Sequence, residues 1–385
     1  MQKESGYDKS EKKSVFDRIH LELSKYYQIK FNELSLDFEI YDLETTEQLN
    51  FNESSLLIHL YREQITERYQ HFVTYLNSHF ITKYNPLIDY FENLPKWDGV
   101  DYISKYASYV STDNDILFAK HLKKWAVRAV KTIFHSHQIN KHCIILANGE
   151  QNAGKSTYLE NLCPQSLKHY YYENIGISKD DRIKLCKAFI INIEEMEIMG
   201  NYDLNSIKST ISQLSVNERL PYAKKSTLLY RTCSFLGSTN KLEFLNDDSG
   251  SVRWIVFEVN GRINFDYSQE FNIDNFWAHA FEIYKNNPDF KSCITDEEAK
   301  ENEKRNERYT VPSVETECVI KYYDSVDELD YCRTATDVSI ELARLGYKVN
   351  INKLGSAFKK QGFKRVKHPK LQIYVYLAKP KFKNI

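Results

Sequence analysis

The sequence predicts an α/β fold built around a parallel sheet. Four short apolar runs have the length of buried strands: Cys143–Ala147, Ala188–Ile193, Cys233–Gly237 and Trp254–Val259. Helical stretches separate several of these runs, and this alternation is typical of a parallel sheet with helical connections. A glycine-containing segment directly follows the first run and leads into another helical stretch. We therefore expect the sheet to carry a ligand site where its first strand ends.

Length and composition limit the class of protein. The 385 residues, 42% of them hydrophobic, suffice for two or three domains with their own cores. The seven cysteines form no CxxC pair, so we expect free thiols and no zinc site. The N-terminus has no apolar signal segment, and no run approaches 18 apolar residues. We therefore expect a cytoplasmic protein without a membrane partner.

Residues 1–135 are predicted to form a mainly helical N-terminal or collar region. Apolar spacing indicates helices over about 14–27, 54–68 and 69–81, while the alternating segment Leu36–Tyr41 indicates one strand. Turn residues surround a short helix between 85 and 99, and helices then continue to about residue 134.

The segment from Gly149 to Ser156, GEQNAGKS, matches the phosphate-loop pattern GxxxxGK[ST] between a strand and a helix. Its glycines allow the backbone N–H groups to surround phosphates, and the helix N-terminus adds partial positive charge. Lys155 is expected to contact the β- and γ-phosphates of ATP, and Ser156 to bind Mg²⁺. The alternative is an ordinary strand–helix turn that contains glycine. The predicted nucleotide-contacting residues are Gly149, Asn152, Gly154, Lys155, Ser156 and Thr157.

Polar residues end or precede the other strands. Glu194 and Glu195 follow the second strand, where acids can hold Mg²⁺ and polarise water. Glu194 is the predicted metal ligand together with Ser156. Asn240 follows the third strand, where its amide could orient water, although asparagine is also common in turns. Arg253 precedes the fourth strand and is either a surface charge or an arginine finger that acts on a neighbouring subunit.

These motifs, in the order GEQNAGKS, FIINIEEME, NERLPYAKK, GSTN and DDSGSVRW, resemble the virulence-associated protein E family over roughly residues 80–265. That family is grouped with superfamily 3 helicases and poxvirus-type primase-helicases. The resemblance implies an AAA+-like core, with Walker acids at Glu194 and especially Glu195, sensor 1 at Asn240, and an arginine finger at Arg253. The family usually has two arginines at that point, and Val252 takes the first position here.

The resemblance also implies a hexameric ring whose central pore holds single-stranded DNA. Residues 219–231 suggest two strands around a basic tip, and the family places such a hairpin in the pore. Lys224 and Lys225 would then contact phosphates without reading bases. The alternative is a solvated lysine turn.

The C-terminal residues 331–385 carry 13 lysines and arginines against two acids, a net charge of +11. Helices are expected at 334–345 and 352–361, followed by two strands within 363–377, which is the pattern of a winged helix. Its basic helix and wing could contact duplex DNA, or the unit could serve protein contacts. The predicted DNA contacts are Lys359, Lys360, Lys364, Arg365 and Lys367.

The predicted organisation is an N-terminal region (1–135), a P-loop ATPase core (136–295), a charged linker (296–330) and the winged-helix-like domain (331–385). The first hypothesis for function is an ATP- and Mg²⁺-dependent helicase that replicates a phage or mobile genetic element, with a separate primase. A second is an ATP-gated DNA-binding assembly, such as an origin binder, helicase loader or defence sensor. A small-molecule kinase would use the same loop, but the basic C-terminus disfavours it.

Overall fold

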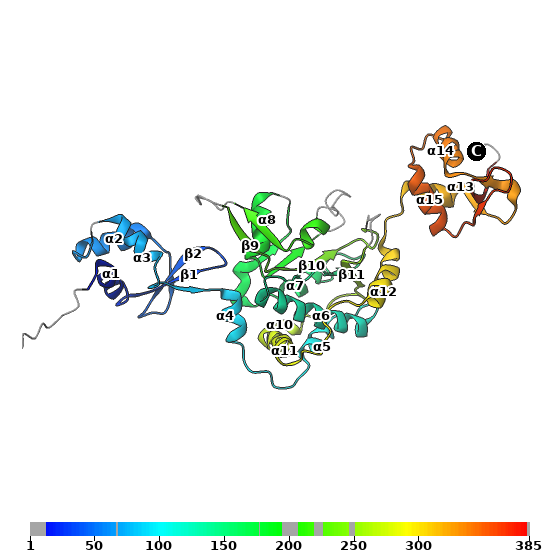
Figure 1. Ribbon diagram of the computed structural model, residues 1–385. Coiled ribbons are helices and arrows are strands. Elements are labelled where there is room, and N and C mark those ends of the chain that lie inside the picture. Colours follow the sequence, from blue (N-terminus) through cyan, green and yellow to red (C-terminus); the bar gives the residue numbers. More distant parts are fainter. Residues whose placement is uncertain are drawn as a thin grey trace, which may run out of the picture. The chain divides into compact units, whose positions relative to one another are not determined.

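The computed structural model describes residues 13–66, 68–176, 178–194, 207–218, 226–245 and 251–382. The chain divides into two compact units, drawn in Figure 1. Unit 1 comprises Met1–Leu242 and Ser251–Lys304, and unit 2 comprises Glu243–Gly250 and Arg305–Ile385. The predicted boundaries at residues 135, 295 and 330 stay predictions.

The first part of unit 1 is a small mixed module, in which a sheet of four strands accompanies the helices of the N-terminal region. Its elements are α1 (Val15–Leu23), β1 (Tyr27–Asn32), β2 (Asp37–Asp42), β3 (Gln48–Leu49), α2 (Glu53–Arg62), α3 (Tyr69–Leu76) and β4 (Thr82–Tyr84). The strands form a sheet in the order β3-β2-β1-β4. Strand β1 was missed because only Ile29 and Asn32 of its six residues are buried. Pairing with β2 stabilises it, and local sequence does not report such pairing.

The five-stranded sheet at the centre of unit 1 is parallel throughout, as predicted. Its strands are β5 (Cys143–Ala147), β6 (Tyr171–Glu173), β7 (Ile190–Ile193), β10 (Ser234–Thr239) and β11 (Trp254–Glu258). They lie in the order β11-β5-β10-β7-β6. All four predicted strands are confirmed, and every residue of β5, β7 and β10 is buried. Continuous apolar runs identify such strands because both faces are covered.

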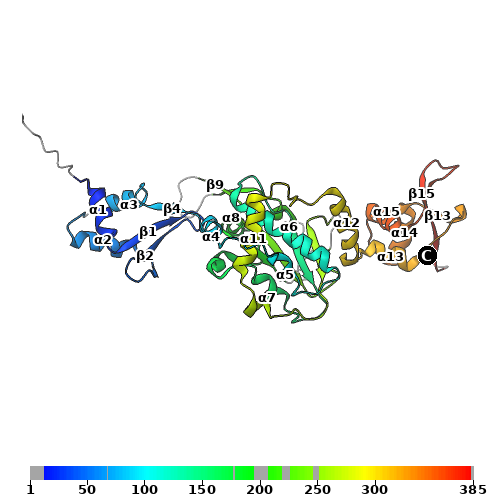
Figure 2. The same cartoon turned by 90° about the horizontal axis from the view of Figure 1, so that it is seen from below.

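Helices cover the sheet and complete one shared core. They are α4 (Pro86–Glu92), α5 (Tyr102–Ala107), α6 (Asp115–Phe134), α7 (Lys155–Glu160), η1 (Gln165–Tyr170), α8 (Lys179–Lys187), α10 (Tyr267–Glu270), α11 (Ile273–Asn286) and α12 (Asp296–Asn306). Helices α6 and α11 lie side by side (Figure 2). A buried tryptophan on each of these helices forms a hydrogen bond to another element. Trp125 of α6 donates to the Phe235 carbonyl, and Trp277 of α11 donates to the Leu162 carbonyl. Each indole N–H is thereby satisfied inside the core.

An antiparallel hairpin is inserted between β7 and β10. It consists of β8 (Ser215–Glu218) and β9 (Thr227–Tyr230), paired from Ser215 with Tyr230 to Glu218 with Thr227. Strand β9 lies where the second predicted strand was expected, whereas β8 ends just before the predicted range of 219–231. Residues 219–225, which include the predicted first strand and the basic tip, lie outside the described part of the chain.

Unit 2 has its own core and a four-stranded sheet. Its elements are η3 (Glu307–Tyr309), α13 (Val314–Tyr322), β12 (Tyr323–Ser325), η4 (Leu329–Tyr331), β13 (Cys332–Arg333), α14 (Ala335–Arg344), α15 (Ile351–Lys360), β14 (Arg365–Lys367) and β15 (Tyr374–Pro380). The two predicted helices and the final two strands are confirmed. Residues 314–325, expected within a linker, instead form α13 and β12. Their side chains Cys318, Val319 and Tyr323 lie in this core. The sequence pattern did not indicate these elements, because acidic residues interrupt the apolar spacing of the segment.

Among the residues that the structure describes, no helix combines the length and the apolar character needed to cross a bilayer.

Candidate functional site

The loop between β5 and α7 is fixed to the strand next to it. Asn148 is buried where β5 ends, and its Nδ2 donates to the Val259 carbonyl at 2.9 Å and the Gly261 carbonyl at 3.2 Å. Its Oδ1 accepts from the backbone N of Glu150 at 2.6 Å. This one side chain therefore joins the start of the loop to the end of β11. Asn148 was not among the predicted site residues, since it stands just before the glycine pattern.

Two residues of the loop adopt backbone conformations with positive φ. Gly154 caps α7 with φ +87°, and Asn152 has φ +60°. Glycine and asparagine are the residues that tolerate this region best. A Cβ at position 154 would clash with the end of the Phe265 ring, which would have to move aside. Glycine is therefore favoured here mainly by its positive φ. Gly149 is an exposed residue at the start of the loop.

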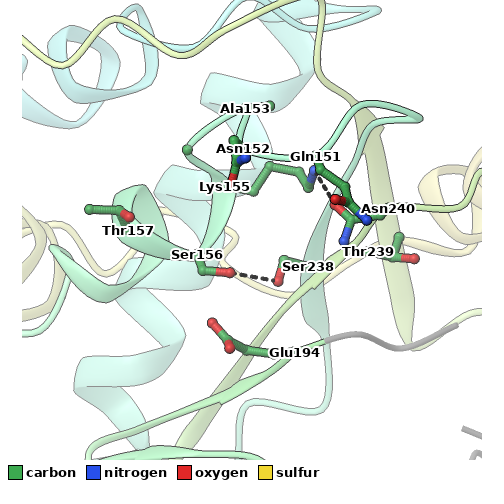
Figure 3. A pocket seen from close by; sticks show the side chains of 11 residues that line it. Gln151, Asn152, Ala153, Lys155, Ser156, Thr157, Glu194, Ser238, Thr239 and Asn240 are labelled. Carbon is green, nitrogen blue, oxygen red and sulfur yellow. Dashed lines mark hydrogen bonds between the residues drawn. The ribbon is translucent and has the colours of Figure 1, made fainter. Parts of the chain in front are cut away.

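Lys155 and Asn240 meet although they lie 85 residues apart in the chain. The Lys155 Nζ donates to Oδ1 of Asn240 at 2.9 Å and to the Glu150 carbonyl at 3.2 Å. Lys155 is only 5% exposed, so its ammonium is held at the floor of the loop (Figure 3). An ammonium held at this point, beside the backbone N–H groups of the loop and the N-terminus of α7, is well suited to bind an anion.

The loop, two strand ends and α7 enclose a pocket of about 330 Å³. Its lining residues are Gln151, Asn152, Ala153, Gly154, Lys155, Ser156, Thr157, Glu194, Ser238, Thr239 and Asn240. Ser156 Oγ lies 3.1 Å from Ser238 Oγ, and Figure 3 shows Glu194 on the same side of the pocket. These residues converge because β5, β7 and β10 are parallel, so their carboxyl ends share one edge of the sheet. Ser238 was missed, although it precedes Asn240 in the GSTN segment.

The pocket fits the predicted ligands by the chemistry of its side chains. Lys155 and the N-terminus of α7 favour phosphate groups. The hydroxyl of Ser156 and the carboxylate of Glu194 are oxygen donors of the kind that Mg²⁺ prefers. The Glu194 backbone N is fixed by Asn174 Oδ1 at 2.9 Å, so this acid is anchored at the end of β7. The residues present can therefore hold a nucleoside triphosphate and a magnesium ion.

Arg253 lies away from this pocket. Its carbonyl accepts from the backbone N of Cys143, so it stands at the amino end of β5 and β11, opposite the loop. Its Nε donates to Ser212 Oγ at 2.9 Å. Burial and the nearby Arg253 charge lower the pKa of Lys208 to about 8. Arg253 therefore cannot reach the pocket of its own chain, and its predicted action on a neighbouring subunit stays a prediction.

Three predicted site residues cannot be placed. Glu195, the second acid after β7, lies outside the described residues, and so do Lys224 and Lys225 at the tip between β8 and β9. Their assigned roles stay predictions.

The predicted DNA-contacting side chains of unit 2 are all exposed: Lys359, Lys360, Lys364, Arg365 and Lys367. Lys359 and Lys360 end α15, and the other three lie on or beside β14. Two of them have internal partners, since Lys364 pairs with Asp327 and the Arg365 guanidinium lies 4.5 Å from the ring centre of Tyr374.

Known proteins resemble this chain in sequence and in fold. A family profile described as the virulence-associated protein E-like domain matches residues 91–311, more than half of the chain. Among solved structures, "The apo structure of NrS-1 C terminal region (305-718)" matches with 13% identity and a TM-score of 0.51, covering 96% of this chain and 100% of that one. Two A-form apo structures of the NrS-1 C terminal region match at 12% and 14% identity, both with a TM-score of 0.48. They cover 95% of this chain and 98% and 99% of theirs. No curated protein matches.

Proposed function

Since this chain belongs to the virulence-associated protein E-like family, we propose that it is a P-loop ATPase of the superfamily 3 helicase type. Its role would be in DNA replication of a phage or mobile genetic element, in the cytoplasm of the host. The observation that carries this proposal is the convergence of Lys155, Ser156, Glu194 and Asn240 on one pocket at the carboxyl edge of the parallel sheet.

Each polar group of the pocket has its own proposed role in phosphoryl transfer. The loop N–H groups and the Lys155 ammonium bind and orient the phosphates, while Ser156 and Glu194 would hold Mg²⁺. A bound Mg²⁺ would neutralise charge that develops on the phosphate oxygens. Asn240, now bonded to Lys155, could turn its amide to position the attacking water. Glu195, directly after Glu194, is proposed to accept the proton of that water.

The sheet order supports an AAA+-like core. Strand β10, which carries Asn240, lies between β5, which leads into the phosphate loop, and β7, which ends at Glu194. An insertion of one strand between these two allows a sensor residue to face both the phosphates and the acid. The remote position of Arg253 agrees with a site completed by a neighbouring subunit, and we propose a homo-hexameric ring on this ground.

The proposed path of DNA uses two parts of the chain. The hairpin of β8 and β9 would bring Lys224 and Lys225 to the phosphates of single-stranded DNA in the pore. The helices α14 and α15 with the hairpin of β14 and β15 would act as a winged helix on duplex DNA, through the five exposed basic residues. Priming would come from a separate primase.

ATP turnover with and without single-stranded DNA tests this proposal. We expect Lys155→Ala to abolish turnover, because it removes the cation at the floor of the pocket. Lys224→Ala with Lys225→Ala should keep basal turnover and lose its stimulation by DNA. The matched control is Lys96→Ala with Lys141→Ala, two exposed lysines of the same unit. Absence of ATP binding or turnover in every assembly state would refute the proposal, and turnover without unwinding of a forked duplex would favour the ATP-gated assembly.

A further inference from the structure

The N-terminal module contains a second open hollow, far larger than the pocket at the phosphate loop. Its volume is about 850 Å³, against about 330 Å³ for the pocket. Helix α1, the end of α2, the connection after it and the start of α3 contribute its lining residues: Val15, Arg18, Tyr61, Arg62, Gln64, Ile65, Thr66, Arg68 and His71. The proposed ATPase activity makes no use of this hollow.

All arginines of the module gather at this hollow. Residues 13–84 contain 11 acids and seven lysines or arginines, so the module as a whole is acidic. Nevertheless all three of its arginines, Arg18, Arg62 and Arg68, line the hollow and are exposed. Exposed arginines that gather at one place in an acidic module indicate an anionic ligand.

None of these three guanidinium groups forms an ion pair with any described residue. The nearest acid in sequence to Arg18 is Asp17, whose carboxylate accepts from Ser14 in the capping box of α1. That contact lowers the pKa of Asp17, whose carboxylate is hydrogen-bonded at the N-terminus of α1. Glu67 lies outside the described residues. Without an ion pair to any described residue, the arginines can present their planar donors to phosphate.

The backbone that positions the arginines is well anchored. Gln64 adopts φ +55°, and the backbone N of Ile65 donates to the Leu60 carbonyl at 3.0 Å, which ends α2 directly after Arg62. Thr66 is buried, and its Oγ1 lies 2.9 Å from His71 Nδ1 and accepts from the backbone N of Arg68 at 3.2 Å. These contacts hold the described residues on either side of position 67 in place before any ligand binds.

An exposed aromatic ring completes the hollow. Tyr61 is 59% exposed and adjoins Arg62. Arginines for the backbone together with an exposed ring for a base are the combination that binds single-stranded nucleic acid. We propose that this hollow is a single-stranded DNA site, with Arg18, Arg62 and Arg68 on phosphates and Tyr61 stacked on a base. This site is additional to the pore and to the winged helix.

The test measures binding of a fluorescein-labelled oligo-dT of about 20 nucleotides to the full-length chain by anisotropy, over a range of salt concentrations. All variants carry Lys224→Ala and Lys225→Ala, so the proposed pore contacts do not contribute. Arg18→Gln with Arg62→Gln and Arg68→Gln should weaken binding, and should reduce the slope of log K against log salt by about 2, at about 0.7 per phosphate contact. Tyr61→Ala should weaken binding about five-fold or more without a change of slope.

The control replaces Lys13, Lys25 and Lys83, three exposed lysines of the same module outside the hollow, with glutamine. It removes the same charge and should leave affinity and slope nearly unchanged. Equal losses in the control would overturn the proposal, because the effect would then be general charge. An unchanged triple-arginine variant would also overturn it. So would equal losses on duplex DNA with no effect of Tyr61→Ala, since those contacts would belong to a duplex. ATP turnover does not enter the binding measurement, so a failure of the proposed ATPase would be distinguishable.

Discussion

Replacing Gly154 with alanine tests whether the loop conformation seen here is the one that binds nucleotide. Gly154 has φ +87°, and an L-residue in this region of positive φ costs about 1–2 kcal/mol. The new Cβ would also lie closer to Cζ and Cε2 of the Phe265 ring than van der Waals contact allows. Phe265 is 41% exposed, so its ring can move aside, whereas the backbone penalty remains.

The expected magnitude follows from these two contributions. If the loop relaxes in the absence of nucleotide, it must recover the strained conformation when nucleotide binds. A cost of about 1–2 kcal/mol then reduces the population of the competent loop, and raises the apparent Kd for nucleotide, by about 5- to 30-fold. In the single variant Gly154→Ala, the contact between the new Cβ and the Phe265 ring adds to this loss of affinity.

Titration with a fluorescent ATP analogue separates the two contributions. Gly154→Ala is compared with wild type, and the double variant Gly154→Ala with Phe265→Ala is compared with Phe265→Ala, which removes the ring from both members of the second pair. We expect the second comparison to keep a loss of about five-fold or more, which comes from φ alone. If Gly154→Ala binds as tightly as wild type, the positive φ at this position is not needed for binding and the reasoning is wrong.

Two further predictions concern stability and duplex binding. Burial opposes ionisation of Glu298, but hydrogen bonds from Lys120, Lys124 and the Thr295 backbone outweigh it and lower its pKa from 4.5 to about 2. Ionised Glu298 therefore stabilises the fold fully above about pH 4.5, and Glu298→Gln should lower the free energy of unfolding by about 2 kcal/mol at pH 7, measured in urea. The difference in stability between wild type and variant should shrink as pH falls from about 4.5 toward 2. A stability difference that does not depend on pH would contradict this prediction. Separately, Lys359→Gln, Lys360→Gln and Lys367→Gln together should weaken duplex DNA binding and reduce its salt slope by about 2.7, at about 0.9 per contact. Lys321→Gln, Arg344→Gln and Lys348→Gln are the control, and equal effects of both sets would contradict a specific DNA face.

Sequence patterns succeeded where one property of a segment dictates its structure. The run Cys143–Ala147 was recognised as a strand because a strand covered on both faces is apolar throughout. In unit 2, Thr334 caps α14 and Gly346 follows its end with φ +87°, and the helix lies where the sequence predicted it. Local patterns failed for β1 and for α13, whose stability comes from distant partners.

The site itself shows the same division. The sequence alone determined which loop is proposed to bind phosphate, because its glycines, Lys155 and Ser156 lie within eight contiguous residues. Only the tertiary structure decided that β10 lies beside β5, which brings Asn240 to Lys155 and Ser238 to Ser156. It likewise placed Arg253 at the opposite edge of the sheet and gathered three arginines around a hollow in the N-terminal module. Strand order and helix packing arise from burial summed over distant segments, and no local pattern of residues contains that sum.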